Sequence, residues 1–407
     1  MSTIARSRSQ PADRWETAVA VALAAVIFLG TWGLLHVGFW RHHQVVDVPV
    51  YQRYGEAITR GQIPYRDFTP EYPPLALPTF VVPALVSHDL EGFRAAFEVE
   101  MAACGLALVL LVALGARALG DGSRRLAATT AAVGLFPLAL GTVVLTRFDL
   151  WPAALAAAAL AALLAGRDRL GLGVLGLATA AKLYPAVLLP LAVVWVWRRR
   201  GRRAALVGLG VFAAAVAVCF LPFVALAPGG VADSLGRQLG RPLQIESLGG
   251  AILMTARRAE VIGGYGSNNI AGTPAKLLAA GFEVVEILAL LWCWWGFARG
   301  RAEPERFCAY AAASVAAFVA FGKVLSPQYL IWLVPLVALV RGRRGFAAAG
   351  LLAAACLLTQ WWTPTRYGEY KDEFRWAWVV LGRDVVLVAL FAALAGAGLR
   401  RDRGSVA

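Results

Sequence analysis

The sequence predicts an all-α polytopic membrane protein. Hydrophobic residues make up 59% of its 407 positions and charged residues only 16%, whereas a soluble domain averages about 25% charged residues. The apolar residues come in long runs, and the polar stretches between them are too short to fold as soluble domains. We therefore expect a single transmembrane domain over residues 1–407.

Twelve apolar runs are expected to form about twelve membrane helices. The first is too long for a signal-peptide core and lacks a small-residue cleavage site, so we expect it to be retained. The runs lie near residues 17–39, 94–119, 125–145, 150–166, 170–182, 184–197, 204–226, 276–298, 306–323, 327–340, 345–362 and 376–399.

Clusters of arginine between the runs predict the orientation in the membrane. Basic clusters mark cytoplasmic loops, and placing all of them inside leaves an even number of crossings between successive clusters. The net charge of +14 is explained in the same way, so we expect no nucleic-acid partner. A multi-pass plasma-membrane protein with both termini in the cytoplasm is predicted. The clusters lie at the amino terminus and near 117–125, 167–169, 198–203, 299–306, 341–344 and 400–403.

Two of the helix pairs are short and broken by lysine and proline. The runs at 170–182 and 184–197 rise only about 20 Å each, short of a roughly 30 Å hydrocarbon core. Between them lie Lys182, Tyr184 and the helix-breaking Pro185. We expect a helical hairpin with Lys182 and Tyr184 at its bend.

The stretch "FGKVLSPQYLIWLVP" repeats this arrangement around Lys323, Pro327 and Gln328. Irregular backbone at membrane depth needs protein or a water-filled cavity around it, so two such bends favour a cavity that binds an anion. Snorkelling of both lysines to the membrane interface is the structural alternative.

The remaining polar residues fall in the predicted outer loops. The large ones span 40–93 and 227–275, with shorter segments at 146–152 and 363–376. The "PPLALPTFVVPALV" stretch of the first loop is too short and Pro-rich for a crossing, so an interfacial or re-entrant segment is expected. The second loop is expected to form amphipathic helices on the membrane surface. The active surface should therefore face the outside.

Several motifs in these loops resemble the family 87 glycosyltransferases, which are membrane-embedded enzymes of the GT-C class that use polyprenyl-phosphate sugars. The mannosyltransferases of phosphatidylinositol mannosides belong among them. The resemblance spans most of the chain in order. The motifs are Asp47 with Val50-Tyr51, Pro64-Tyr65-Arg66-Asp67-Phe68, Tyr72-Pro73-Pro74, Lys182-Leu183-Tyr184-Pro185, Arg241-Pro242-Leu243-Gln244-Ile245-Glu246-Ser247 and Ser326-Pro327-Gln328-Tyr329-Leu330.

This resemblance implies a bundle of about a dozen helices whose two outer loops form a half-dome over a cavity. It also implies a catalytic aspartate in the first loop, which corresponds to Asp47. A polyprenyl-phosphate sugar would be the donor, and an extracytoplasmic glycolipid or glycan the acceptor. The motifs do not fix the sugar: mannose is preferred, with arabinose and glucose as the alternatives.

The chemistry of such a transfer fits one well-placed carboxylate. A sugar on a lipid phosphate already has an anionic leaving group, so one base that deprotonates the acceptor hydroxyl is sufficient for an inverting attack. Cations must stabilise the departing phosphate. We expect Lys182, Arg147 or Lys323 to do so.

Other side chains are candidates for substrate contacts, each with a structural alternative. Tyrosines can stack on sugar faces, but they are also enriched at membrane interfaces. Asp149 can form an ordinary ion pair with Arg147 or help to build the donor site. Glu246 is a second candidate acid, and its amphipathic context favours contact with the acceptor or a structural role. The predicted substrate-binding residues are Tyr51, Tyr65, Arg66, Tyr72, Asp149, Tyr184, Glu246 and Gln328.

No cofactor or metal is expected. His42 and His43 are adjacent but lack a clear third ligand. The "GLGVLG" stretch at 171–176 matches a dinucleotide-binding pattern, but it lies inside an apolar run with no preceding strand. It is expected to serve helix packing.

The competing hypothesis is a membrane transporter or lipid flippase, because broken helices with polar bends are also typical of alternating-access carriers. Two features favour the enzyme: the hairpins are not set in obviously similar halves of the chain, and the acidic residues concentrate in the outer loops instead of mid-membrane.

Overall fold

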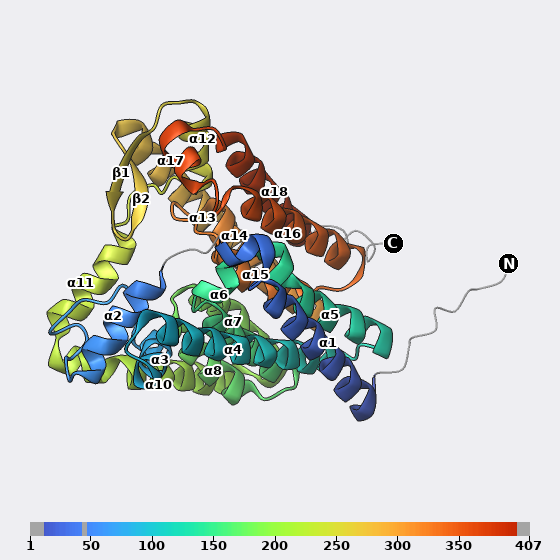
Figure 1. Ribbon diagram of the computed structural model, residues 1–407. Helices are drawn as coiled ribbons and strands as arrows, with labels where there is room; N and C mark the ends of the chain where they lie inside the picture. Colours follow the sequence, from blue (N-terminus) through green and yellow to red (C-terminus); the bar gives the residue numbers. More distant parts are fainter. Residues whose placement is uncertain (1–11, 43–46, 397–407) are drawn as a thin grey trace.

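The computed structural model describes residues 12–42 and 47–396, which form a helical bundle with one small β-hairpin (Figure 1). Each of the twelve predicted apolar runs corresponds to one helix of at least ten residues. These helices are α1 (Arg14–Leu34), α4 (Leu90–Ala118), α5 (Ser123–Leu140), α7 (Leu150–Leu164), α8 (Asp168–Ala181), α9 (Leu189–Arg200), α10 (Arg202–Leu226), α13 (Thr273–Arg299), α14 (Pro304–Phe321), α15 (Tyr329–Ala338), α16 (Gly342–Trp362) and α18 (Ala377–Ala395).

Within the described residues, six of these helices are long and apolar enough to cross a membrane by length and composition: α1, α4, α10, α13, α16 and α18. Six such helices are fewer than the twelve or so crossings predicted, so the prediction requires the shorter helices to cross the membrane as well. Four of those shorter helices, α8 with α9 and α14 with α15, are the two broken pairs of the sequence.

Shorter elements connect the long helices, and most of them gather at one end of the bundle (Figure 1). They are α2 (Val48–Thr59), α3 (Pro78–Val86), α6 (Val143–Thr146), α11 (Pro228–Leu239), α12 (Leu248–Thr255), α17 (Tyr367–Glu373), the 3₁₀ helices η1 (Gly38–His42), η2 (Pro74–Ala76) and η3 (Tyr184–Leu188), and the strands β1 (Glu260–Gly264) and β2 (Ser267–Ala271).

The antiparallel β1–β2 hairpin is a departure from the all-helical prediction for the second outer loop. Tyr265 and Gly266, between the strands, both have positive φ, at 55° and 64°. Two successive residues with positive φ make the tight turn whose twist suits a hairpin. Helical pieces, as predicted, occupy the rest of that loop as α11 and α12.

Helix α15 lies at the centre of the bundle. It packs against α5 and α7 on one side and against α14 and α16 on the other. Every residue from Leu330 to Val337 is buried, so this ten-residue helix is enclosed by protein and does not face lipid. It therefore connects α4, α5 and α7 with the later helices α14 and α16.

Glycines allow α8 to pack closely against its neighbours. A Cβ atom on Gly171 would stand 2.6 Å from the Leu163 side chain of α7, and one on Gly176 would stand 2.6 Å from the Phe212 carbonyl oxygen of α10. Both distances are too short for any larger residue. The "GLGVLG" stretch therefore serves helix packing, as predicted.

Both predicted helical hairpins are confirmed. α8 ends at Ala181, η3 begins at Tyr184, and α9 returns so that Arg200 Nε lies 3.3 Å from Asp168 Oδ2. α14 and α15 likewise return to the same end, where Arg341 Nη1 lies 3.2 Å from Glu305 Oε1.

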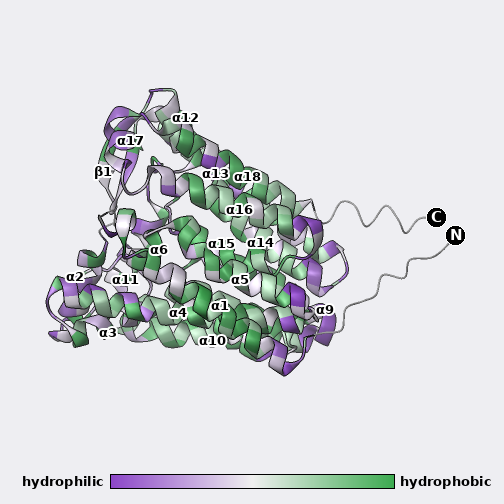
Figure 2. Ribbon diagram, turned by 45° about the vertical axis from the view of Figure 1, so that its right-hand side comes forward, coloured by the Kyte–Doolittle hydropathy of each residue, from purple (hydrophilic) through white to green (hydrophobic). Residues whose placement is uncertain are grey.

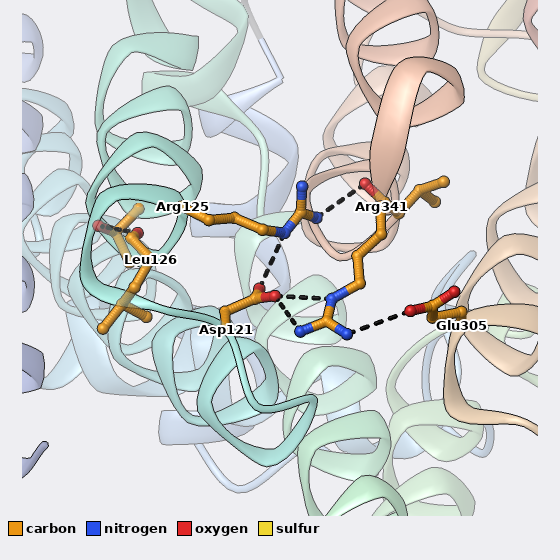
Figure 3. A network of polar contacts seen from close by, with 7 residues as sticks. Asp121, Arg125, Leu126, Glu305 and Arg341 are labelled. Carbon is orange, nitrogen blue, oxygen red and sulfur yellow. Dashed lines mark hydrogen bonds and ion pairs between the residues drawn. The ribbon is translucent and has the colours of Figure 1, made fainter. Parts of the chain in front are cut away.

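The five basic clusters between residues 117 and 344 lie at one end of the bundle, away from the short elements. The clusters at the amino terminus and at 400–403 fall largely outside the described residues. A buried carboxylate, Asp121, accepts hydrogen bonds from Arg125 Nε at 3.0 Å and from Arg341 Nε at 2.7 Å (Figure 3). Arg198 donates to the carbonyl oxygens of Ala298 and Gly300. Hydrophilic residues gather at the two ends of the bundle, and its middle is apolar (Figure 2).

Replacing Asp121 should destabilise this end of the bundle. In Asp121→Asn, two guanidinium groups lose their shared buried anion, which should cost about 2 to 4 kcal/mol of unfolding free energy. The midpoint of thermal unfolding in detergent would measure it. Asp372→Asn is the matched control, because its exposed pair with Lys371 should contribute less than about 1 kcal/mol. Equal midpoints for the two variants would contradict the prediction.

Candidate active site

A cavity of about 840 Å³ opens at the end of the bundle that carries the short elements. Both hairpin bends line it, through Lys182 to Tyr184 and through Gly322 to Tyr329. The first outer loop, the second outer loop, α13 and the segment 363–367 complete the walls. The bends thus enclose a common cavity, as the favoured sequence hypothesis requires.

Lys182 is held by a buried carboxylate behind the wall. Its Nζ lies 2.5 Å from Asp149 Oδ1, and the same oxygen accepts a hydrogen bond of 2.6 Å from Trp332 Nε1. The ammonium also lies 4.5 Å from the centre of the Phe148 ring, within cation–π range. The ion pair therefore ties the start of α7, the end of α8 and α15 together.

Aromatic rings form one side of the bend. Trp332 is stacked between Tyr184, at 4.1 Å between ring centres, and Tyr329, at 3.9 Å. Beside them the buried Gln328 Oε1 has no hydrogen-bond partner among the described residues. This wall can offer a flat apolar face and an amide to a ligand.

Asp47 and Arg147 form an ion pair, and both residues line the cavity. Asp47 directly precedes α2, and its side chain is 31% exposed, whereas that of Arg147 is only 13% exposed. The buried Nε of Arg147 has no hydrogen-bond partner within the described residues. The pair thus combines an accessible carboxylate with a guanidinium that retains donor capacity.

Lys323 is already neutralised by a glutamate. Its Nζ lies 2.5 Å from Glu283 Oε1 and donates a 2.8 Å hydrogen bond to the Leu239 carbonyl oxygen. Glu286, one turn further along α13, also lines the cavity. The sequence predicts that acids concentrate in the outer loops, but Glu283 and Glu286 lie on the membrane-length helix α13. They are tolerated there because α13 turns them towards the cavity.

Glu246 is a buried acid on the cavity wall. Only 4% of the residue is exposed, and its Oε2 has no hydrogen-bond partner among the described residues. Burial raises the pKa of Glu246 to about 7, although Arg383 and Tyr367 oppose the shift. From α18, Arg383 donates a 2.7 Å hydrogen bond to the backbone oxygen of Glu246. A carboxyl group that titrates near neutrality thus faces the cavity from a firmly held loop.

The two outer loops contact each other above the cavity. Ser234 Oγ donates to the Pro70 carbonyl oxygen at 2.7 Å, and Gln238 Nε2 donates to that of Glu71, also at 2.7 Å. A Cβ atom on Gly230 would stand only 1.7 Å from the Tyr65 carbonyl oxygen, so the close approach of the loops requires glycine there.

The structure brings eight of the predicted site residues onto the walls of this cavity. Asp149 lies immediately behind the wall as the partner of Lys182. The eight are Asp47, Tyr72, Arg147, Lys182, Tyr184, Glu246, Lys323 and Gln328.

Three other predicted substrate-binding residues do not line the cavity. Tyr51 is 1% exposed and stacks on Phe80 at 4.5 Å. Tyr65 is 4% exposed, and its hydroxyl donates to the Tyr72 carbonyl oxygen at 2.7 Å. Arg66 points to the surface, where it pairs with Asp67 at 2.8 Å. All three contacts organise the first outer loop.

Sequence reasoning missed further polar side chains of the cavity. Glu283 and Glu286 could have been noticed as acids three residues apart within an apolar run. Arg241, Gln244, Tyr329 and Trp332 lie in stretches already singled out. Asn268 and Tyr367 carry no signal of their own, because only the fold brings them to the wall. The missed residues are Arg241, Gln244, Asn268, Glu283, Glu286, Tyr329, Trp332 and Tyr367.

A metal site is not suggested by the described residues, which contain no group of three or more potential protein ligands. His43 lies outside them.

The chain matches the model of glycosyltransferase family 87 over residues 68–327, well over half of its length. The protein belongs to glycosyltransferase family 87. It is therefore a membrane glycosyltransferase, and this membership decides against the transporter hypothesis. None of the curated protein sequences compared with the chain matches it.

Two solved structures are similar in fold to this chain. ArnT from Cupriavidus metallidurans, in a crystal structure bound to undecaprenyl phosphate, is similar with a TM-score of 0.52 and 16% identity, covering 96% of this chain and 79% of ArnT. The apo crystal structure of that protein gives a TM-score of 0.51 and 15% identity, covering 93% and 76%. The family 87 chain thus has the GT-C fold.

The raised pKa of Glu246 predicts a pH dependence of stability. Between the ordinary carboxyl pKa of 4.5 and about 7, the folded state binds a proton that the unfolded state releases, so stability falls as pH rises through this window. Glu246→Gln should remove that component, and its unfolding midpoint should therefore rise relative to wild type between pH 5 and pH 7.5. Glu260→Gln, at an exposed position of β1, is the control. A constant difference across this range would contradict the prediction.

Proposed function

We propose that this family 87 glycosyltransferase is an inverting mannosyltransferase. It takes mannose from a polyprenyl phosphate and transfers it to an extracytoplasmic glycolipid or glycan of the cell envelope. The observation that carries the proposal is that Asp47, an accessible carboxylate of the first outer loop, meets several cationic side chains on the walls of one cavity. The choice of mannose rests on the resemblance to a family that includes the mannosyltransferases of phosphatidylinositol mannosides, because the motifs themselves do not fix the sugar.

Two observations support a polyprenyl-phosphate donor: the location of the cavity and the similarity of the fold to that of ArnT. The cavity lies at the end of the bundle, where the reactive phosphate of a membrane lipid could enter while its chain stays among apolar helices. ArnT, which has the same fold, was crystallised with undecaprenyl phosphate. A polyprenyl-linked donor therefore fits both the location of the cavity and its charge.

Asp47 is the proposed general base. Its carboxylate takes the proton of the acceptor hydroxyl while the acceptor oxygen bonds to the anomeric carbon. The bond from that carbon to the phosphate oxygen breaks at the same time, and its electron pair leaves with the polyprenyl phosphate. Attack from the opposite face inverts the anomeric configuration.

The cations of the cavity have different capacities to hold the departing phosphate. Lys182 and Lys323 are already paired with Asp149 and Glu283, so they contribute mainly by positioning and by partial charge. Among the described residues, the Nε atoms of Arg147 and Arg241 have no hydrogen-bond partner, although Arg241 Nη2 donates to the backbone oxygen of Tyr265 at 3.2 Å. We assign the strongest phosphate contacts to these two arginines, whose planar donor groups suit phosphate oxygens.

Arg147 is proposed to contact both the base Asp47 and the phosphate of the donor. In the free protein it pairs with Asp47, and this pair orients the carboxylate. A donor phosphate would compete for the same guanidinium. Binding of the donor would thus loosen Asp47 and make it a stronger base when the acceptor arrives.

The remaining wall residues are proposed to bind sugar and acceptor. Tyr184, Tyr72 and Gln328 can provide stacking faces and an amide, and Glu246 an acceptor contact. Asp149 acts through Lys182. Tyr51, Tyr65 and Arg66 would act only indirectly, by shaping the loop that carries Asp47.

The protein is proposed to lie in the plasma membrane with the cavity on the extracytoplasmic side. The basic end of the bundle, opposite the cavity, would then face the cytoplasm, as the distribution of arginine in membrane proteins favours. Both termini would be cytoplasmic.

Asp47→Asn should lower the rate of sugar transfer by roughly 10²- to 10⁴-fold, the usual contribution of a general base. The measurement is transfer from radiolabelled polyprenyl-phosphate mannose to a native lipid extract by the purified protein, after donor binding by the variant has been confirmed. Asp233→Asn, an exposed position on α11, should transfer at the wild-type rate. Equal transfer by Asp47→Asn and wild type would exclude Asp47 as the base.

Arg241→Gln should lower kcat/KM for the donor by about tenfold to a hundredfold, since a hydrogen bond to a charged group contributes about 1.5 to 3 kcal/mol. Arg237→Gln removes the same charge from an exposed position on α11 and should change the value less than about twofold. Steady-state kinetics with varied donor would measure both. Equal effects would show that only the overall charge of the loop matters.

A further inference from the structure

A second hollow, of about 830 Å³, lies at the basic end of the bundle. It forms where the turn between α7 and α8 meets the turn between α9 and α10. It is separated from the cavity by the whole of α8, because Asp168 at the start of that helix lines the hollow and Lys182 just past its end lines the cavity. Fourteen helical residues rise about 20 Å. We call this hollow the basic groove.

The basic groove has a strong excess of positive charge. Asp168 is the only carboxylate among its lining residues, and Arg200 pairs with it at 3.3 Å. Within the described residues, no carboxylate pairs with any of the remaining three arginines. These are Arg167, Arg169 and Arg203.

Two helix N-termini add to this charge. α8 begins at Asp168 and α10 at Arg202, and neither has a side-chain cap on its first backbone N–H groups. Such N–H groups, together with the helix dipole, favour a bound anion. The groove therefore combines three unpaired guanidinium groups with two uncapped helix starts.

One flank of the groove is apolar. Leu170 and Val207 line it and are 52% and 39% exposed. Only Ala205 and Gly208 are buried on the whole of the apolar helix α10, which continues beyond Val207 to Leu226. Such a surface is suited to lipid chains, so the groove opens directly onto the region where those chains would lie.

We propose that the basic groove binds the phosphate headgroup of an anionic phospholipid, with the acyl chains lying along α10. A basic recess between membrane helices has the chemistry that recognises such headgroups. A free phosphate ion would use the arginines but leave the apolar flank without a function. The site does not depend on the proposed sugar transfer, because it lies at the other end of α8 and involves no residue of the cavity.

The test is lipid binding to the purified full-length protein in a neutral detergent, followed by native mass spectrometry. The probes are phosphatidylglycerol and phosphatidylcholine with identical acyl chains. We expect phosphatidylglycerol to bind at least about fivefold more tightly. The combined variant Arg167→Gln, Arg169→Gln and Arg203→Gln should lose at least about tenfold of that affinity, since each basic residue near an anionic lipid contributes on the order of fivefold.

A charge-matched control separates the groove from the general charge of this end. The combined variant Arg124→Gln, Arg301→Gln and Arg343→Gln also removes three exposed arginines from the basic end, but none of them lines the groove. It should keep phosphatidylglycerol affinity within about twofold of wild type. The single variants Arg169→Gln and Arg203→Gln, which perturb the fold least, should each lose an intermediate amount.

Three results would overturn the proposal. The first is equal loss in the groove and control variants, which would reduce the effect to surface charge. The second is equal binding of phosphatidylglycerol and phosphatidylcholine. The third is displacement of phosphatidylglycerol by inorganic phosphate at the same concentration, which would show that the groove recognises a free anion and that the apolar flank contributes nothing.

Discussion

The ion pair between Lys182 and Asp149 is the interaction on which the cavity depends. Both side chains lie among apolar helices, where an unpaired charge would be costly to bury. Because Trp332 donates to the same carboxylate oxygen, the pair also locates the central helix α15. The break between α8 and η3 can thus exist inside the bundle, since the bend and its lysine find their partners in protein and not in lipid.

The basic side chains of the cavity differ in how much of their charge is available to a ligand. Lys182 and Lys323 are neutralised by their partners, so they maintain the shape of the two bends. Arg147 and Arg241 retain donor capacity towards the cavity. A predicted cation at a bend is therefore not automatically a ligand-binding cation, because the acid it meets in the fold decides how much of its charge a substrate can use.

The two ends of the bundle carry different kinds of polarity. At the cavity end, carboxylates and cations are mixed, and several acids are buried against apolar neighbours. At the opposite end, arginines predominate, with Asp121 and Asp168 as buried or half-buried anions between them. The first end suits chemistry on a charged leaving group, and the second suits anchoring to a surface of negative charge.

The sequence by itself determined the membrane class, the position of all twelve long helices, the two bends and the family. These follow from local properties: apolar runs, proline breaks, arginine clusters and short motifs act through neighbours in the chain. It also pointed to Asp47 and Glu246, through the motifs that resemble family 87. Arg147 and Lys182 drew attention because a basic residue between two apolar runs stands out without any structure.

Only the tertiary structure decided which of these side chains meet. Asp47 and Arg147 are far apart in sequence, as are Lys323 and Glu283, and no local pattern predicts either pair. The tyrosines of the first loop show the same limit: Tyr72 reaches the cavity, whereas Tyr51 and Tyr65 are buried in loop packing. The local sequence is similarly aromatic around all three, and the direction of each ring depends on residues that the chain brings there from other helices.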